Sequence, residues 1–346
     1  MQEKRVLLDL TAEELKEYLL GIGQPAFRAR QLFAWLHKGA PFARMANLPK
    51  ELRDRLEAEC VDLPMALHAS FPSQKDDTVK FLFACLDGNI VEGVLMHYHY
   101  GYSLCISTQV GCKMGCAFCA STLEGCVRSL SAGEMLGEVL LANRFLGEKG
   151  RVGHIVLMGS GEPLDNYENT IRFLRLLNDP GGLNLSLRNV SLSTCGLVPQ
   201  IERLMGEGLP ITLSISLHAP NDQIRRQIMP VANVYPMDDL MRAVRAYVVR
   251  TGRRVVFEYA LIDRLNSLPE HARELARLVR GLQCHVNLIP LNAVDERSLA
   301  PASPAAVQTF LHTLEAERVS ATIRREMGAD IAGACGQLRR RHLQAT

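Results

Sequence analysis

The sequence has few aromatic side chains and no long apolar run. Phenylalanine, tryptophan and tyrosine make up 6% of its 346 residues, and tryptophan occurs once. So small an aromatic share, beside 47% hydrophobic residues, suits an α/β architecture better than an all-β one. We find neither a secretion signal nor an apolar stretch long enough to span a membrane. These absences predict a protein of the reducing cytoplasm without membrane contact, where clustered cysteines bind metal or take part in chemistry.

Charge of either sign is not in excess. Lys and Arg total 39 and Asp and Glu total 37, which gives a net charge of +2. A balance this even neither requires nor excludes a nucleic-acid partner, so any RNA contact must come from local basic patches. One such set, Arg28, Arg30 and Lys38, falls on a predicted helix, and another, Arg324, Arg325 and Arg339–Arg341, lies towards the end of the chain. For both, an ordinary solvated surface is the simpler interpretation.

Three of the ten cysteines lie in one short loop, Cys112-Lys-Met-Gly-Cys116-Ala-Phe-Cys119. A structural zinc site normally uses four protein ligands in two pairs, and this spacing offers no fourth ligand. Three thiolates that hold a cluster of four irons leave one iron open to another ligand, which indicates chemistry rather than a structural role. Gly111 and Gly115 free the backbone to wrap a bulky group. A zinc loop or a set of buried thiols is the alternative.

The wider pattern divides the chain into three parts. The first sixty residues read as short helices, and the first helix begins at the capping box Thr11-x-x-Glu14. Two β-like runs, Val79–Leu86 and Ile90–Met96, flank an Asp-Gly dipeptide, which is a strong hairpin signal. From about residue 101 the pattern alternates between strands and helices. We therefore expect a helical N-terminal domain (1–60), a β-hairpin extension (61–98) and an α/β domain (99–346).

The α/β part contains six strand–helix units and a final strand. The strand-like runs are Leu104–Thr108, His154–Met158, Val190–Ser193, Thr212–Leu217, Val255–Leu261, Val286–Leu291 and Ala321–Arg324. The helical runs are Ala132–Leu146, Tyr167–Asn178, Pro199–Glu207, Asp238–Arg250, Pro269–Leu282 and Pro304–Arg318. This order predicts a parallel sheet covered by helices, with the chemistry at the carboxyl ends of the strands.

Polar residues follow several of these strands, as such chemistry requires. They are Gly161-Glu162 after the second strand, Ser193 on the third, Ser216-Leu217-His218 on the fourth and Asn292 after the sixth. Each one alone is an ordinary cap or turn residue. Together they can converge on one edge of the sheet, where a polar cofactor needs such groups.

Three further residues are candidates for chemistry. Cys105 lies on the strand that leads into the cysteine loop, and Cys335 lies in a Gly/Ala-rich segment near the end of the chain. For either thiol the simpler interpretation is a buried structural cysteine, although Cys335 has little apolar sequence around it to pack against. Glu92 is an acidic residue within an apolar strand, and such a side chain usually points at water.

Further characteristic stretches occur along nearly the whole chain. They are Pro25–Gly39, Asn47–Lys50, Lys80–Phe83, Val91–Glu92, Cys105–Thr122, Gly159–Pro163, Ser216–Asn221 and Gly328–Leu338. In these stretches the chain resembles the RlmN/Cfr family of radical S-adenosylmethionine (SAM) RNA methyltransferases, and most closely its RlmN branch. The resemblance implies a radical SAM partial (βα)6 barrel, a small helical N-terminal domain and a β-hairpin linker.

The resemblance also implies a role for each candidate residue. Cys112, Cys116 and Cys119 would bind a 4Fe–4S cluster. SAM would be contacted by Gly161, Glu162, Ser193, Ser216, Leu217, His218 and Asn292. One SAM would methylate Cys335, and a second, cleaved by the cluster, would give a 5′-deoxyadenosyl radical that takes a hydrogen from that methyl group. The carbon radical would add to C2 of adenine, with Glu92 as the base, and Cys105 would release the product by forming a disulfide with Cys335.

The implied substrates are RNAs. They are an adenosine of the peptidyl transferase centre in 23S rRNA and the adenosine 3′ to the tRNA anticodon, and a flavodoxin or ferredoxin would supply electrons to a monomeric enzyme. Methylation at C8, as in the Cfr branch, is the nearest alternative because it would use the same two cysteines. A metal-stabilised RNA-binding module without catalysis is an alternative of another class.

Overall fold

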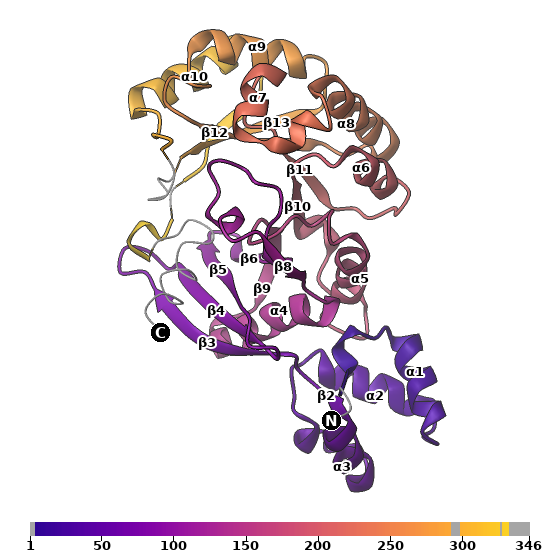
Figure 1. Ribbon diagram of the computed structural model, residues 1–346. Helices are drawn as coiled ribbons and strands as arrows, with labels where there is room; N and C mark the ends of the chain where they lie inside the picture. The colour runs from indigo at the N-terminus through magenta and orange to yellow at the C-terminus, as the bar shows by residue number, and fades with distance from the viewer. Residues whose placement is uncertain (1–3, 292–297, 326, 332–346) are drawn as a thin grey trace.

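The computed structural model describes residues 4–291, 298–325 and 327–331, and its largest feature is one ten-stranded mixed sheet (Figure 1). The strand order is β14-β13-β12-β11-β10-β9-β6-β5-β4-β3. Seven neighbouring strands, from β6 to β14, pair in parallel, and the other three join them antiparallel at one edge. The predicted α/β fold is confirmed, and the hairpin is part of the same sheet as the barrel strands.

The parallel strands alternate with helices along the chain. The strands are β6 (Gly101–Ile106), β9 (Val152–Leu157), β10 (Val190–Thr194), β11 (Thr212–Ser216), β12 (Val255–Leu261), β13 (Cys284–Pro290) and β14 (Ala321–Ile323). The helices are α4 (Ala132–Leu146), α5 (Tyr167–Asn178), α6 (Val198–Leu204), α7 (Asp222–Ile228), α8 (Met237–Thr251), α9 (Pro269–Val279) and α10 (Pro304–Ala316). The short helix α7 is an addition to the predicted set. None of the helices in the described chain is both long and apolar enough to cross a membrane.

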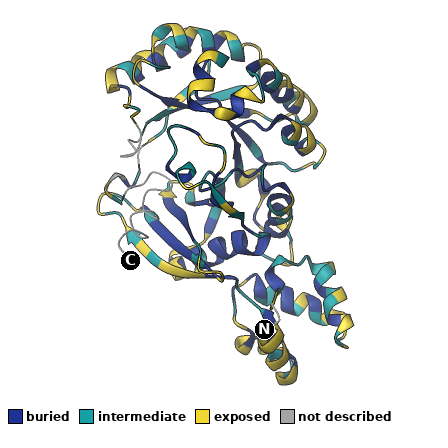
Figure 2. Ribbon diagram, viewed as in Figure 1, coloured by how far each residue is buried: buried dark blue, intermediate teal, exposed yellow. Residues whose placement is uncertain are grey.

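The antiparallel edge consists of β3 (Met65–Pro72), β4 (Val79–Cys85) and β5 (Ile90–Tyr98). The predicted hairpin forms, and its turn residue Gly88 has a φ of +83°, in the left-handed region that glycine tolerates best. Sequence analysis missed β3, which carries mostly exposed side chains because it is the edge strand (Figure 2). At the other side of the hairpin, β5 pairs with β6, which sets Val94 opposite Cys105.

The N-terminal helices α1 (Ala12–Gly21), α2 (Phe27–Leu36) and α3 (Lys50–Glu59) pack beside the sheet domain (Figure 1). The predicted capping box at Thr11 and Glu14 is present. A short parallel pair of β1 (Arg5–Val6) and β2 (Cys60–Val61) closes this part. An Asp9 carboxylate oxygen accepts the backbone N–H of Gly133 at 2.6 Å, which joins the N-terminal part to the start of α4.

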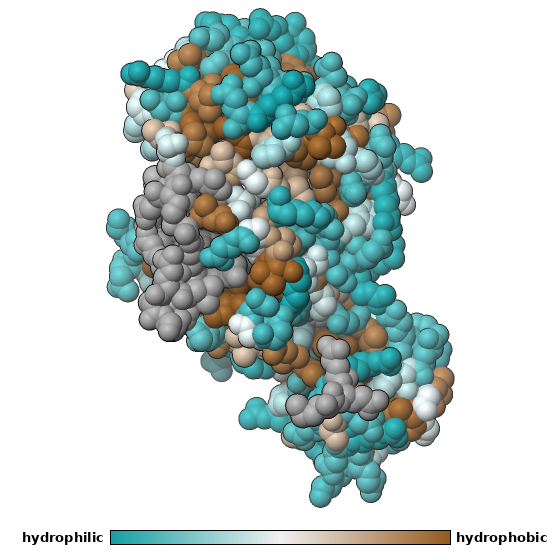
Figure 3. Space-filling model, viewed as in Figure 1, coloured by the Kyte–Doolittle hydropathy of each residue, from teal (hydrophilic) through white to brown (hydrophobic). Residues whose placement is uncertain are grey.

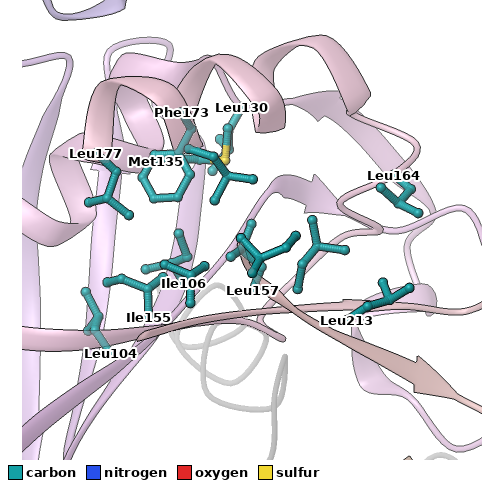
Figure 4. Close-up of a cluster of buried hydrophobic side chains, with 14 of the residues drawn as sticks. Leu104, Ile106, Leu130, Met135, Ile155, Leu157, Leu164, Phe173, Leu177 and Leu213 are labelled. Carbon is teal, nitrogen blue, oxygen red and sulfur yellow. The ribbon is translucent and has the colours of Figure 1, made fainter. Parts of the chain in front are cut away.

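The hydrophobic core lies between the sheet and its helices. Side chains of β6 and β9, such as Leu104 and Ile155, face Met135 on α4 and Phe173 on α5, and all four are fully buried (Figure 4). Hydrophilic residues dominate the outer helices on the face that Figure 3 displays. Burial of this apolar surface fixes the strands, and it thereby fixes where their carboxyl ends meet.

Candidate active site

A cavity of about 400 Å³ opens where the parallel strands end. Cys105 from β6, Ser193 from β10 and Ser216 from β11 line it, so residues far apart in sequence meet there. The three cysteines of the loop and Glu162 line the same cavity. The structure therefore brings most of the candidate residues to one site. Asn292 and Cys335 lie outside the described residues.

The cysteine loop is held by a small antiparallel ribbon of β7 (Gln109–Gly111) and β8 (Cys126–Ser129). The N–H of Cys112 donates to the carbonyl of Gly125 at 2.8 Å, which closes the base of the loop. Gly111 has a φ of +79°, and a Cβ atom there would lie 2.0 Å from the Gly125 oxygen, so only glycine fits. The tip of the loop is tied to the barrel by Ala117, whose N–H donates to the carbonyl of Ile228 at 2.8 Å.

The three thiols line one cavity that could hold a cluster. Within the described chain, no group of three or more His, Cys, Asp or Glu side chains is arranged to hold one metal ion. The cysteine ligands of one tetrahedral ion stand roughly 4 Å apart, whereas ligands of different irons in a cluster are more widely spaced. Burial raises the pKa of Cys112 to about 12, and the charge of Cys119 adds to the effect. Thiolates in this loop therefore need a cationic group among them, as iron would provide.

Glu162 is held firmly by backbone donors. Its Oε2 accepts the N–H of Cys195 at 2.7 Å and its Oε1 accepts the N–H of Leu164 at 3.0 Å. Burial raises the pKa of Glu162, and these hydrogen bonds act in the opposite direction. Each carboxylate oxygen accepts more than one hydrogen bond, so Glu162 can still receive a donor from a ligand in the cavity.

Two glycines before Glu162 allow the chain to pass close to β6. A Cβ atom on Gly159 would lie 2.5 Å from the carbonyl oxygen of Ile106, and one on Gly161 would lie 2.6 Å from the Cβ of Gln109. Gly161 also has a φ of +106°. Both positions need glycine for close backbone approach, which is why a Gly-rich turn follows β9.

The ends of β10 and β11 supply two hydroxyls and an imidazole. The Oγ atoms of Ser193 and Ser216 lie 3.3 Å apart. His218 has a φ of +54°, and its Nδ1 accepts the N–H of Ala260 at 2.9 Å. Burial lowers the pKa of His218 to about 3, so the ring is neutral and carries its proton on Nε2 as a donor. Leu217 lies in the core behind the cavity, where its N–H donates to the carbonyl of Glu258.

Phe118, between the second and third cysteines, packs edge-on against His218, with 4.7 Å between the ring centroids. The cysteine loop thus contacts the end of β11 directly. This contact encloses the cavity between the loop and the strand ends, where an apolar ring limits access of water.

Glu92 does not point at water. It is buried, and its Oε2 lies 3.1 Å from Nζ of Lys80, whose side chain is 0% exposed. Alternation along β5 puts Glu92 on the same face as Val94 and Met96, which line the cavity. Cys105 packs against these same two residues. Glu92 and Cys105 therefore share one face of the sheet. Glu92 lies two residues before Val94 on β5 and further from the cavity.

Sequence analysis missed two buried polar groups of this region. Glu258 on β12 lines the cavity and accepts a hydrogen bond from Asn287 on β13 at 2.8 Å. The available signal was an acidic residue in an apolar strand, the same signal that marked Glu92. The other group, Arg225 on α7, is fully buried, and nothing in the sequence distinguishes it from its exposed neighbour Arg226.

The basic residues noted in the sequence lie in different places. Arg30 and Lys38 are exposed on or just after α2, and Arg28 is half-buried beside the ring of Phe27. Arg324 and Arg325 line the cavity. Arg339–Arg341 lie outside the described residues.

Comparison with known protein families identifies two matching segments. The Radical SAM superfamily matches residues 106–279, and the Ribosomal RNA large subunit methyltransferase N-terminal domain matches residues 6–61. The first segment runs from the end of β6 to the end of α9, and the second contains the three N-terminal helices.

Relatives that match over the whole chain have names consistent with these two family matches. The chain is 52% identical over 343 residues to a protein of Alkaliphilus oremlandii named probable dual-specificity RNA methyltransferase RlmN, and the match covers 99% of each chain. It is 50% identical over 339 residues to a protein of the same name from Clostridium tetani, covering 98% of this chain and 97% of the other. Among solved structures, a radical SAM methyltransferase from Sphaerobacter thermophilus superposes with a TM-score of 0.93 at 43% identity, covering 96% of this chain and 98% of that one.

Proposed function

This chain belongs to the RlmN family of radical SAM RNA methyltransferases, and on that premise we propose that it methylates C2 of adenosine in both 23S rRNA and tRNA. The proposed positions are an adenosine of the peptidyl transferase centre and the adenosine 3′ to the anticodon. As a radical SAM enzyme it uses a 4Fe–4S cluster and SAM. The observation that supports the proposal most strongly is the single cavity shared by the cysteine loop, Glu162 and Cys105.

In the proposed site Cys112, Cys116 and Cys119 hold the cluster. When bound, it supplies the electron that cleaves SAM and so makes one-electron chemistry available at carbon. Such chemistry is needed because C2 of adenine is electron-poor and does not attack the methyl group of SAM as a nucleophile. Burial of Cys112 and Cys116 keeps water away from these ligands.

SAM is bound by residues at the strand ends. Glu162 accepts hydrogen bonds from its ammonium group, for which the fixed, buried carboxylate is suited. The hydroxyls of Ser193 and Ser216 can donate or accept, and neutral His218 donates from Nε2. Gly161 and Leu217 contribute through the backbone, and Asn292 completes the proposed set.

Glu92 is the proposed base that removes the C2 proton. The Lys80 ammonium group lies 3.1 Å from Oε2 of Glu92 and holds the carboxylate in place, and a carboxylate is a group that can accept a proton.

Cys335 carries the methyl group and Cys105 releases the product. The Cys105 thiolate forms a bond to the Cys335 sulfur, and the bond between that sulfur and the transferred carbon breaks. The electron pair stays on the carbon, which takes up a proton and becomes the methyl group of the RNA. The RNA leaves, and a disulfide between the two cysteines remains for reduction. Cys335 is the fourth residue after Ile331, the last described residue, so the chain spans at most about 14 Å between them.

A methylation assay with purified protein tests the proposal by identifying the methylated nucleoside. The protein is purified and reconstituted without oxygen, then incubated with SAM, a flavodoxin or ferredoxin reducing system, and fragments of 23S rRNA and tRNA. Mass spectrometry of the digested RNA is expected to show 2-methyladenosine in both RNAs. The appearance of 8-methyladenosine alone would assign the chain to the Cfr type of activity, and a methyl group in one RNA only would remove the dual specificity.

Two variants test the roles of the cysteines. Cys335→Ala should abolish RNA methylation, because no other residue of the proposal carries the methyl group. Cys105→Ala should trap a covalent protein–RNA adduct, visible as a band of higher mass on a denaturing gel, because nothing releases the carbon from Cys335. Normal turnover by either variant contradicts the role assigned to that residue. The protein is proposed to act as a monomer, which sedimentation of the reconstituted protein tests.

A further inference from the structure

Arg225 is the largest fully buried side chain of the described chain. Its guanidinium group donates to three backbone carbonyls at the ends of β10 and β11. Nη2 reaches the oxygens of Cys195 at 2.6 Å and Ser216 at 3.4 Å, and Nε reaches that of Leu217 at 3.2 Å. The side chain therefore ties together the two strand ends that carry Ser193, Ser216 and His218.

The charge of Arg225 has no carboxylate partner in the part of the chain that the structure describes. No carboxylate of the described residues forms an ion pair with Arg225, and Asp222, three residues earlier on α7, is paired with Arg226 at 3.9 Å. Nη1 of Arg225 is buried and finds no hydrogen-bond partner among the described residues. Lys80, the other fully buried cation, does have its carboxylate. An arginine stays charged even when buried, so the environment of Arg225 must contain negative charge from another source.

The groups around Arg225 that can supply this charge are sulfurs. Cys195, whose carbonyl accepts the Nη2 donor of Arg225, and Cys116 both interact electrostatically with the Arg225 guanidinium group. The cysteine loop also packs on the end of α7, where the N–H of Ala117 donates to the carbonyl of Ile228. Cys116 is one of the three proposed cluster ligands. With the cluster bound, the three cysteine thiolates would contribute negative charge to the site, and reduction of the cluster by one electron would add a further negative charge.

We propose that Arg225 is the fixed countercharge of the cluster site: its three carbonyl acceptors hold the guanidinium behind Cys116, where it stabilises the reduced form of the cluster and raises its reduction potential. Arg225 is a positioning residue in this proposal, because it acts through the cluster and the strand ends and does not touch substrate. The inference rests on the proposed cluster site. It adds a residue that sets how readily the site accepts the electron on which the reaction depends.

Three variants separate charge from hydrogen bonding and from general effects on α7. Arg225→Gln removes the charge, and Arg225→Lys keeps the charge but loses the planar fork. Arg226→Gln is the matched control, since it removes a positive charge from the next residue of the same helix, where the side chain is half-exposed. Each protein is reconstituted without oxygen, its iron and sulfide are counted, and its midpoint potential is measured by a redox titration followed by electron paramagnetic resonance, without SAM.

We expect the reduction equilibrium of Arg225→Gln to shift at least about tenfold towards the oxidised cluster, which is a potential about 59 mV more negative for a one-electron couple. Arg225→Lys should stay within about threefold of the unaltered protein, and Arg226→Gln should match it. Equal potentials for Arg225→Gln and Arg226→Gln, at full iron content, overturn the inference.

The outcome is distinguishable from failure of the proposed function. If the unaltered protein takes up neither iron nor sulfide, the proposed cluster site is wrong, and the role of Arg225 fails with it. If Arg225→Gln does not fold, Arg225→Lys carries the test. A potential near that of the unaltered protein supports the role of charge, and a shift of about tenfold or more contradicts it.

Discussion

Replacing Lys80 by methionine is predicted to destabilise the protein severely. Methionine fills a similar volume, but it leaves the Glu92 carboxylate, 3.1 Å away and buried, without this cation. Removal of one partner of a buried ion pair costs about 3–5 kcal/mol, because the remaining charge stays out of water. The entropy of unfolding is about 2.1 cal/mol/K per residue, so a chain of 346 residues loses about 1.4 °C of melting temperature per kcal/mol. The expected decrease is therefore about 4–7 °C.

The double variant Lys80→Met with Glu92→Met provides the control. It removes both charges and keeps apolar volume on this face of β4 and β5, so most of the lost stability should return. The assay is thermal unfolding followed by circular dichroism, with all proteins prepared without oxygen and at equal iron content. An unchanged melting temperature for Lys80→Met, or a double variant as unstable as the single one, refutes this account of the pair.

The same double variant also tests the proposed base. If Glu92 only stabilises the fold, the restored protein should methylate RNA normally. If Glu92 removes the C2 proton, the protein should fold and still acquire a methyl group on Cys335, yet release little methylated RNA. Peptide mass spectrometry measures the first event and nucleoside mass spectrometry the second.

Two further predictions concern a buried histidine of the N-terminal part and a glycine at the base of the cysteine loop. Burial lowers the pKa of His37 to about 4, so below about pH 6.5 the unfolded chain binds a proton that the folded one does not, and stability falls by up to about 1.4 kcal/mol per pH unit. His37→Phe keeps the ring contact with Phe33 and should reduce the loss of melting temperature between pH 7 and pH 5; an equal loss contradicts this assignment. Gly111→Ala should open the base of the cysteine loop and abolish iron uptake, because the added Cβ meets the Gly125 carbonyl. Gly88→Ala, with a similar positive φ but open space around it, should cost only about 1 kcal/mol and leave iron content unchanged, so equal iron loss in both contradicts the steric argument.

Local patterns predicted most elements of the barrel. The expected helices Ala132–Leu146 and Tyr167–Asn178 match α4 and α5 residue for residue, since apolar periodicity defines both and a capping box starts the first. The expected helix Pro199–Glu207 instead begins at Val198 and ends at Leu204, ahead of two glycines. Helix ends are set by a few backbone contacts, which periodicity does not report.

Some elements gave no local signal of this kind. Strand β3 contains no β-branched residue and is mostly exposed at the sheet edge, and it forms by pairing with β4. Helix α7 is only seven residues long and begins at Asp222, directly after the N-cap residue Asn221, whose side chain accepts the N–H of Ile224. Pairing partners and short caps depend on neighbours in space, so a window along the sequence does not detect them.

The candidate site divides in a similar way. The cysteine loop and Glu162 were evident in the sequence, because ligand spacing and glycine turns are local features. Glu92 was named, but its expected exposure was wrong. Lys80 lies twelve residues earlier on the opposite strand, and their ion pair depends on the register of β4 with β5.

The sequence by itself determined which chemical groups this protein has, the order of its strands and helices, and the family to which it belongs, because these follow from residue type and spacing along the chain. The tertiary structure alone decided which groups became partners: Lys80 with Glu92, Cys105 with Val94, and Arg225 with the ends of β10 and β11. Whether a charge is buried, and which charge lies beside it, depends on packing between distant segments. The electrostatic character of the site therefore appears only when the chain is folded.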